Sequence, residues 1–146
     1  MKHLLLFVTL IFLLPGCSER AVPLNRAEWG YWDITVSPKR YNMSIWMIET
    51  NWFDGKSKED IISQLPERRT YTIEGDCKIF CVKESDGWNI DHVPQPLAYL
   101  DVYFDSKGMV TKAVLREREQ SFGEKTDGKG KVTSDKYKTV MVWEKK

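Results

Sequence analysis

The sequence predicts an α+β fold of two layers, with one or two short helices packed on an antiparallel sheet. Helical patterns lie before Pro66, and strand-like segments separated by turn residues follow one another after it. Helices followed by a run of strands are typical of domains whose helices cover one sheet face. The chain shows no internal repeat, and its 146 residues suit one domain behind a short leader.

A short apolar run at the start of the chain indicates export. Residues 4–14 (LLLFVTLIFLL) follow the basic Lys2, and Thr9 is their only polar member. A helix of this length spans about 17 Å, which is too short for a hydrocarbon core of about 30 Å. The run is therefore typical of a secretory signal rather than a membrane span. We predict that residues 1–16 are a signal peptide.

The end of this run resembles the bacterial lipobox, in which small residues precede a cysteine. Residues 14–17 read LPGC, and the resemblance implies diacylglyceryl transfer to the Cys17 sulfur, cleavage before Cys17 and acylation of the new amine. Two or three acyl chains anchor a protein durably, whereas one chain binds only marginally. An aspartate after the cysteine would resemble an inner-membrane retention signal, so Ser18 favours the outer membrane. The alternative is an ordinary signal peptide with a chance cysteine.

Charge gives no indication of nucleic-acid binding. Loss of residues 1–16 removes Lys2, so basic residues fall from 22 to 21, against 21 acidic residues. A net charge near zero leaves no electrostatic footprint for nucleic acid. Residues 116–146 are mildly basic, which a solvated surface explains, with a headgroup or partner patch as the alternative.

The expected domain organisation is simple. Residues 17–28 would form the lipidated cysteine and a polar tether, and residues 29–146 a single α+β domain. Residues 29–36 (WGYWDITV) alternate well enough to predict a strand. Ser37 and Pro38 end it, because a serine–proline pair favours a turn.

Residues 40–53 fit two patterns. Ile45, Ile48 and Trp52 share one face of a helix, whereas residues 43–47 (MSIWM) alternate as in a strand. The helix is the favoured interpretation.

Residues 58–65 are expected to form a short amphipathic helix. Ser57 can cap it, and acidic residues in its first turn complement the exposed N–H groups. Ile61 and Leu65 share a face, and Pro66 disfavours continuation of the helix.

Strands dominate the rest of the chain. Residues 97–104 would place Leu100, Val102 and Phe104 on one face. The turn of residues 105–108 (DSKG) would form a hairpin, because its glycine can adopt positive φ. The other expected strands are residues 70–73, 78–83, 109–117 and 137–143, and the expected loops are residues 88–96 and 121–135.

Two cysteines remain after Cys17, at Cys77 and Cys81. In a strand their Cα atoms would lie about 13 Å apart, beyond the roughly 4.4–6.8 Å that a disulfide spans. In a turn or helix they would come within about 6 Å. The strand-forming sequence around them argues against pairing, whereas the turn at residues 74–76 argues for it. A disulfide therefore stays an open alternative.

Tryptophan is the unusual excess of this chain. Large rings fill the core of a small domain efficiently, and this is the favoured interpretation. The alternative is an aromatic binding face, for which Trp88, in a loop beside Asp86 and Gly87, is the leading partner-binding candidate. The six tryptophans are Trp29, Trp32, Trp46, Trp52, Trp88 and Trp143.

Two segments carry a family resemblance. Residues 55–65 (GKSKEDIISQL) match a Gly-x-Ser/Thr-x-x-x-Val/Ile-x-x-x-Leu helix start, and residues 104–110 (FDSKGMV) match a Phe-Asp-x-x-Gly-x-Val hairpin. Both motifs resemble those of SmpA/BamE-type small outer-membrane lipoproteins, over roughly residues 54–115. The resemblance implies a two-layer α+β fold and a non-enzymatic role in the envelope, where members of this type help an outer-membrane protein assembly machine.

We therefore expect a lipid-anchored, periplasm-facing protein of the outer membrane that binds another envelope protein and is not an enzyme. His92 is the only histidine of the mature chain, which argues against a two-histidine metal site. We expect no metal and no cofactor beyond the lipid on Cys17. The alternative function is an inhibitor or immunity-type binder of a periplasmic hydrolase. A tight one-to-one complex with a soluble enzyme would indicate that alternative.

Overall fold

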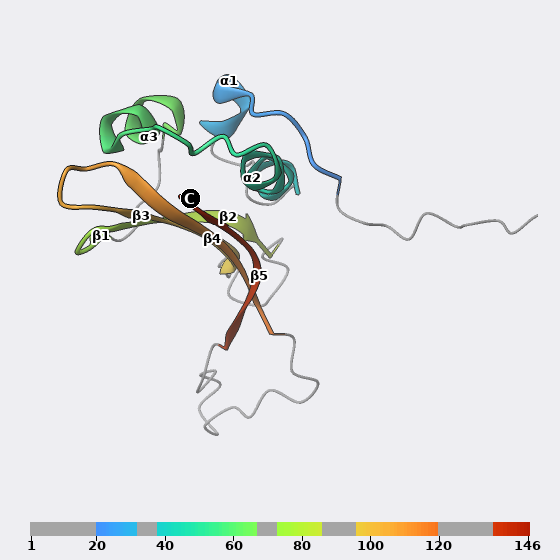
Figure 1. Cartoon of the computed structure of the whole chain (residues 1–146). Coiled ribbons are helices and arrows are strands. Elements are labelled where there is room, and N and C mark those ends of the chain that lie inside the picture. The colour runs from blue at the N-terminus through green and yellow to red at the C-terminus, as the bar shows by residue number, and fades with distance from the viewer. Residues whose placement is uncertain (1–19, 32–37, 67–72, 86–95, 120–135) are drawn as a thin grey trace, which may run out of the picture.

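The computed structural model describes residues 20–31, 38–66, 73–85, 96–119 and 136–146. In these ranges a layer of helices covers one face of an antiparallel sheet (Figure 1). The predicted α+β fold of two layers is confirmed. Cys17, Trp88, His92 and the expected loop of residues 121–135 lie outside the described residues.

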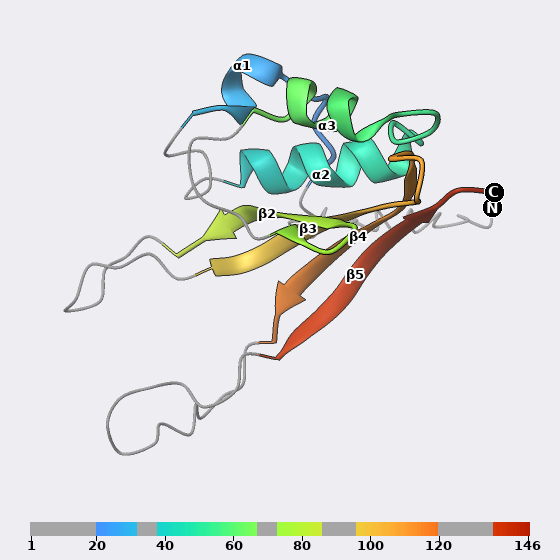
Figure 2. The ribbon, with the colours of Figure 1, turned by 90° about the vertical axis from the view of Figure 1, so that its left-hand side faces the viewer.

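The helix layer has three elements, α1 (Arg26–Trp29), α2 (Lys39–Glu49) and α3 (Lys58–Gln64). Helix α2 confirms the helical interpretation for residues 40–49, whereas residues 50–53 form turns after it, and α3 matches the expected amphipathic helix. Figure 2 shows α2 lying along the sheet, with α1 and α3 above it. The three helices therefore share one face of the sheet.

The sheet is a meander in which each strand pairs with the next in antiparallel orientation. The turn between the third and fourth strands follows the sequence prediction. Asp105 Oδ1 accepts hydrogen bonds from the N–H groups of Lys107 and Met109, both at 2.9 Å, and Gly108 has φ of 76°. The strands are β1 (Ile73–Glu74), β2 (Cys77–Glu84), β3 (Pro96–Phe104), β4 (Val110–Arg118) and β5 (Tyr137–Glu144).

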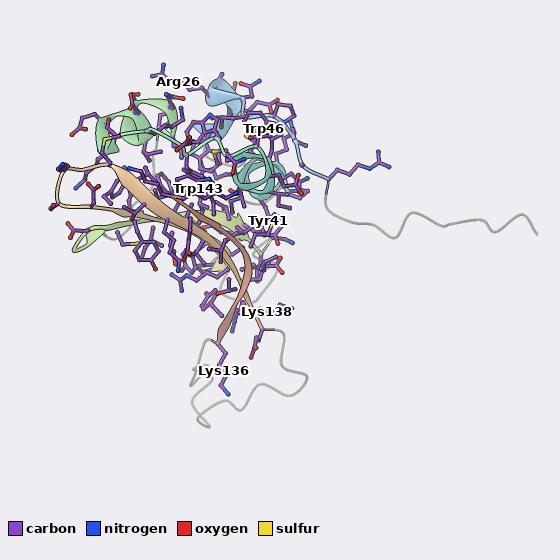
Figure 3. All side chains as sticks on the ribbon, in the orientation of Figure 1. Arg26, Tyr41, Trp46, Lys136, Lys138 and Trp143 are labelled. Carbon is purple, nitrogen blue, oxygen red and sulfur yellow. The ribbon has the colours of Figure 1, made fainter. Side chains whose placement is uncertain are left out.

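The core lies between the two layers. Leu100, Val102 and Phe104 are buried on the helix-facing side of β3, as predicted. Figure 3 shows Trp143 of β5 between the sheet and the helices. Trp29 and Trp143 are buried and Trp46 and Trp52 are partly buried against the same core, so the four described tryptophans are core fillers, as favoured from the sequence.

Helix α1 corrects one prediction. Trp29 was expected to begin a strand, but it ends a helix that Asn25 caps, with Asn25 Oδ1 accepting from the N–H groups of Ala27 and Glu28 at 3.1 and 3.2 Å. An N-cap satisfies backbone donors that a helix start leaves unpaired. The local cap therefore outweighs the alternating pattern at this point. Residues 32–36 of the expected strand lie outside the described ranges.

The predicted boundary of the domain at residue 29 is also too late. Ala21 and Leu24 pack against the core, and the Val22 N–H donates a hydrogen bond of 3.1 Å to the carbonyl of Asn42 in α2. The chain is thus already packed against the core at residue 21, before the expected start of the domain at residue 29.

Arg40 ties three elements together. Its Nη1 donates to the Cys81 carbonyl of β2 at 3.0 Å, and its Nη2 donates to the Trp29 carbonyl at the end of α1. Its guanidinium carbon also lies 4.9 Å from the centre of a Trp29 ring. An arginine stacked on a ring and bonded to carbonyls keeps its charge satisfied in a buried place. Arg40 therefore fixes α2 against both α1 and the sheet.

Helix α3 begins with a reciprocal capping box. The Asp60 N–H donates to Ser57 Oγ at 3.1 Å, and the Ser57 N–H donates to Asp60 Oδ2 at 2.9 Å. The hydrogen bonds from the backbone and the hydroxyl of Ser57 lower the pKa of Asp60 from its ordinary value of 3.8. Because the box satisfies two backbone donors at once, it stabilises a helix of only seven residues.

Replacing Ser57 with alanine is expected to lower the free energy of unfolding by about 1 kcal/mol, the usual cost of losing a serine N-cap. Urea unfolding followed by circular dichroism measures the change. Ser63→Ala is the matched control, because the Ser63 hydroxyl is exposed and donates to the Asp60 carbonyl within the same helix. Its effect should stay within about 0.5 kcal/mol, and equal losses in the two variants would contradict the role of the cap.

Candidate binding surface on the open face of the sheet

The face of the sheet that points away from the helices carries the side chains that do not belong to the core, and we call it the open face. Successive side chains of a strand alternate between faces, so the residues between the core positions belong to it. The strand register places Asp101 of β3 beside Val114 of β4, which in turn lies beside Val142 of β5. No described helix lies on this face (Figures 1 and 2). Among its residues are Ile79, Cys81, Tyr99, Asp101, Tyr103, Lys112, Val114, Arg116, Tyr137, Val142 and Glu144.

Arg116 organises the centre of the open face. Its Nε and Nη2 donate to the two carboxylate oxygens of Asp101 at 2.6 and 3.2 Å. Its guanidinium carbon lies 4.8 Å from the ring centre of Tyr99 and 5.2 Å from that of Tyr137. Strands β3, β4 and β5 each contribute to this cluster, so the sheet register itself brings the four side chains together.

The two tyrosines of this cluster also have packing and hydrogen-bond partners of their own. The rings of Tyr99 and Tyr137 lie 5.2 Å apart at 55°. The Tyr137 hydroxyl donates to the carbonyl of Pro96 at 3.3 Å. A bidentate arginine–carboxylate pair adds geometric specificity to its charge. We refer to Tyr99, Asp101, Arg116 and Tyr137 as the Arg116 cluster.

Burial and the charge of Asp101 shift the pKa values in this cluster. Burial raises the pKa of Tyr99, and the nearby Tyr137 adds to the effect. Burial opposes the charge of Arg116, but the hydrogen bonds and the charge of Asp101 outweigh it, and the pKa of Arg116 is raised. The phenol is therefore neutral and the guanidinium charged at neutral pH.

Exposed apolar side chains surround the cluster. Tyr103 is 37% exposed and Val142 44%, and both rank among the exposed large hydrophobic residues in the described part of the chain. Lys112 and Glu144 form an ion pair of 2.7 Å at the end nearer the β3–β4 hairpin. Tyrosine and arginine are enriched where truncation costs a protein interface most. The open face therefore has the composition of a protein-binding surface.

The two cysteines lie in one strand and are not joined by a disulfide, which contradicts the disulfide alternative. Cys77 and Cys81 both belong to β2, where four residues of extended backbone separate their Cα atoms by about 13 Å. Burial, followed by the charge of Glu84, raises the pKa of the Cys81 thiol to about 12. This thiol is therefore protonated at neutral pH and poorly suited to nucleophilic catalysis.

Thiol titration is expected to find two reactive cysteines per unfolded mature chain, with or without prior reduction, and almost none in the folded protein. Cys77 is buried, and the raised pKa of Cys81 keeps its thiolate fraction very small. An aromatic disulfide reagent at neutral pH, with and without guanidinium, measures both numbers. Two thiols that appear only after reduction would contradict the structure, and fast labelling of the folded chain would contradict the protected state of Cys81.

The open face was missed at the level of sequence, although its signal was present. The pattern that puts Leu100 and Val102 in the core also puts Tyr99, Asp101 and Tyr103 on the opposite face. Their alignment with Arg116 and Tyr137 depends on the register between strands, which the sequence does not specify. Neither Cys17 nor Trp88, the lipidation and aromatic candidates, lies in the described ranges.

Other kinds of site have less support in the described ranges. No three histidine, cysteine, aspartate or glutamate side chains there could together hold a metal ion. Among the same residues, no helix is both long enough and apolar enough to cross a membrane. The helix layer has a hollow of about 650 Å³ whose described lining is Arg26, Ala27, Gly30, Tyr31 and Pro66.

No protein-family model matches the chain, and no curated protein or solved structure is significantly similar to it. The resemblance to SmpA/BamE-type lipoproteins therefore stays a prediction from two short segments. The fold and the open face define a small α+β domain in which Tyr103 and Val142 are exposed beside the partly buried Arg116 cluster.

Proposed function

We propose that the protein is a lipoprotein of the bacterial outer membrane that faces the periplasm, is anchored through Cys17 and binds another envelope protein through its open face. In this proposal the protein is not an enzyme. The observation that carries it is the Arg116 cluster, with Tyr103 and Val142 exposed beside it. The lipobox-like sequence before Cys17 supports the anchor.

The rigidity of the cluster supports a binding role. Ordering side chains during association costs free energy, so a surface whose groups are already fixed binds at a lower cost. Asp101 and Arg116 hold each other, and the rings of Tyr99 and Tyr137 are packed together. Only the exposed side chains at the border of the cluster would then have to be ordered by a partner.

The anchor would add to this function. Confinement to one membrane raises the effective concentration of a binding domain relative to partners on that membrane. The partner class that we propose is therefore an envelope protein of the same membrane. An accessory role in outer-membrane protein assembly follows from the sequence resemblance, and a soluble periplasmic hydrolase is the alternative partner.

Val142→Asp tests the proposal, because it places a charge in the exposed apolar part of the open face. The tagged, acylated protein is purified from detergent-solubilised membranes, and proteins that co-purify are identified by mass spectrometry. Val142→Asp is expected to lose at least one partner that the unaltered protein retains, since burying an unpaired charge at an interface is costly.

Ile62→Asp is the matched control, because Ile62 is 48% exposed and lies on α3 in the other layer. It should retain the partner. Equal partner sets for both variants and the unaltered protein would refute binding through the open face. An outer-membrane partner would support the proposed role, and a soluble enzyme would support the inhibitor alternative. Circular dichroism confirms that both variants fold.

A further inference from the structure

The chain between the predicted anchor and α1 packs against the domain from residue 21 onward. Ala21 and Leu24 pack against the core, and the Val22 N–H is bonded to the Asn42 carbonyl of α2. Asn25 then caps α1. We call residues 20–25 the arm. The arm is held by packing, by a tertiary hydrogen bond and by a helix cap, so it belongs to the folded domain.

Little chain is left to separate this domain from Cys17. Val22 follows Cys17 by five residues, and a chain extends by at most about 3.5 Å per residue, which gives about 18 Å. A folded domain of this size measures roughly 36 Å across, judged from the usual scaling of radius with length. Whatever conformation the connecting residues adopt, Val22 lies within about half a domain width of the acylated residue.

We propose that the arm side of the domain lies against the lipid surface that holds the anchor, so that the domain has a fixed orientation on the membrane. This inference rests on the proposed acylation of Cys17. It goes beyond the proposed function because it assigns a second surface, whose partner is the phospholipid headgroup layer. Figure 1 shows the arm leaving the helix layer on the side of the molecule opposite the β3–β4 hairpin. The hairpin would then lie on the side of the domain away from the membrane.

The side chains of the arm fit such a contact. Arg20, Val22, Pro23 and Arg26, at the arm and the start of α1, are exposed. Arg20 follows Cys17 by three residues, so it lies within about 10 Å of the anchor. This is close to the distance over which salt screens charges, about 8–10 Å. The guanidinium of Arg20 is therefore within electrostatic reach of headgroup phosphates, and guanidinium groups bind phosphate well.

Fluorescence quenching by lipids tests the orientation. Cysteines introduced one at a time as Pro23→Cys and Ser106→Cys are labelled with a small fluorophore in the acylated protein. The unaltered protein, whose remaining thiols are protected, serves as the labelling blank. The protein is reconstituted in vesicles of phosphatidylcholine and phosphatidylglycerol that contain a phosphatidylcholine with a spin-labelled headgroup. Pro23 is in the arm, and Ser106 is exposed in the β3–β4 turn.

Quenching at position 23 is expected to be several-fold stronger than at position 106. A variant with roughly twenty glycine and serine residues inserted after Ser18 is the control, because a flexible linker of that length spans about 25 Å on average. It should remain on the vesicles and lose most of the quenching at position 23. Quenching that persists in this variant would overturn the short tether as the cause of the contact.

Intact mass separates the two possible failures. A protein without acyl mass would overturn the proposed anchor and the orientation together. A protein with acyl mass whose positions 23 and 106 are quenched equally would overturn the orientation and leave the anchor standing. Stronger quenching at position 106 would overturn the assignment of the arm as the membrane-facing side.

Discussion

Replacing Trp29 with alanine is expected to lower the free energy of unfolding by about 3–5 kcal/mol, the usual cost of truncating a buried aromatic residue to alanine. The side chain of Trp29 is fully buried and meets Phe80 of β2 edge to face, with ring centres 6.0 Å apart. It also lies beneath the guanidinium of Arg40. The substitution would thus open a cavity where α1, α2 and the sheet meet.

Urea unfolding of the soluble Cys17→Ser protein, produced without its signal peptide, measures the loss. Trp46→Ala is the control, because Trp46 lies on α2 and is only partly buried against the core. Its truncation should cost clearly less. A smaller loss for Trp29→Ala than for Trp46→Ala would contradict the place of Trp29 at the junction of the two layers.

Tyr103→Ala is expected to weaken binding to the partner about 30-fold, equivalent to about 2 kcal/mol, as truncation of a tyrosine at the centre of an interface does. Tyr103 is 37% exposed on the open face, beside the Arg116 cluster. Its ring is rigid and large, so little ordering would offset the area that it buries. The affinity for the co-purifying protein is measured with the purified pair.

Tyr31→Ala is the matched control for this prediction. Tyr31 is 61% exposed, but it follows α1 in the helix layer. Its loss should change the affinity less than about twofold. Equal losses of affinity in the two variants would show that the open face is not the interface. An unchanged affinity in Tyr103→Ala would show that Tyr103 does not contact the partner.

The sequence predicts those parts of the fold whose cause is local. Ser57 and Asp60 cap α3 through bonds that span three residues, and the turn after Phe104 depends on Asp105 and Gly108 within the same hairpin. The alternation around Leu100 predicts the buried face of β3. In each case the residues that determine the structure are neighbours in the chain.

Other parts depend on contacts between distant segments, and there the sequence was insufficient. The pattern at Trp29 resembled a strand, but the cap by Asn25, the contact with Phe80 and the bond from Arg40 place it at the end of a helix. The Arg116 cluster forms only because β4 pairs with both β3 and β5 in a particular register.

The cysteines show the same limit. From the sequence, the segment around Cys77 and Cys81 could form either a strand or a turn. Its pairing with β3 makes it a strand. Cys77 faces Tyr103 and Cys81 faces Tyr99 in the register of β2 and β3. Extended backbone then rules out a disulfide between the two.

Site-specific photo-cross-linking from the open face tests the central claim most directly. Tyr103 and, separately, Ile62 are replaced by p-benzoylphenylalanine in the acylated protein, and living cells are irradiated. The proposed function predicts a specific cross-link from position 103 to an outer-membrane protein and none from position 62. A cross-link from position 62 to the same protein, or no cross-link from position 103 in membranes that contain the acylated protein, would contradict it.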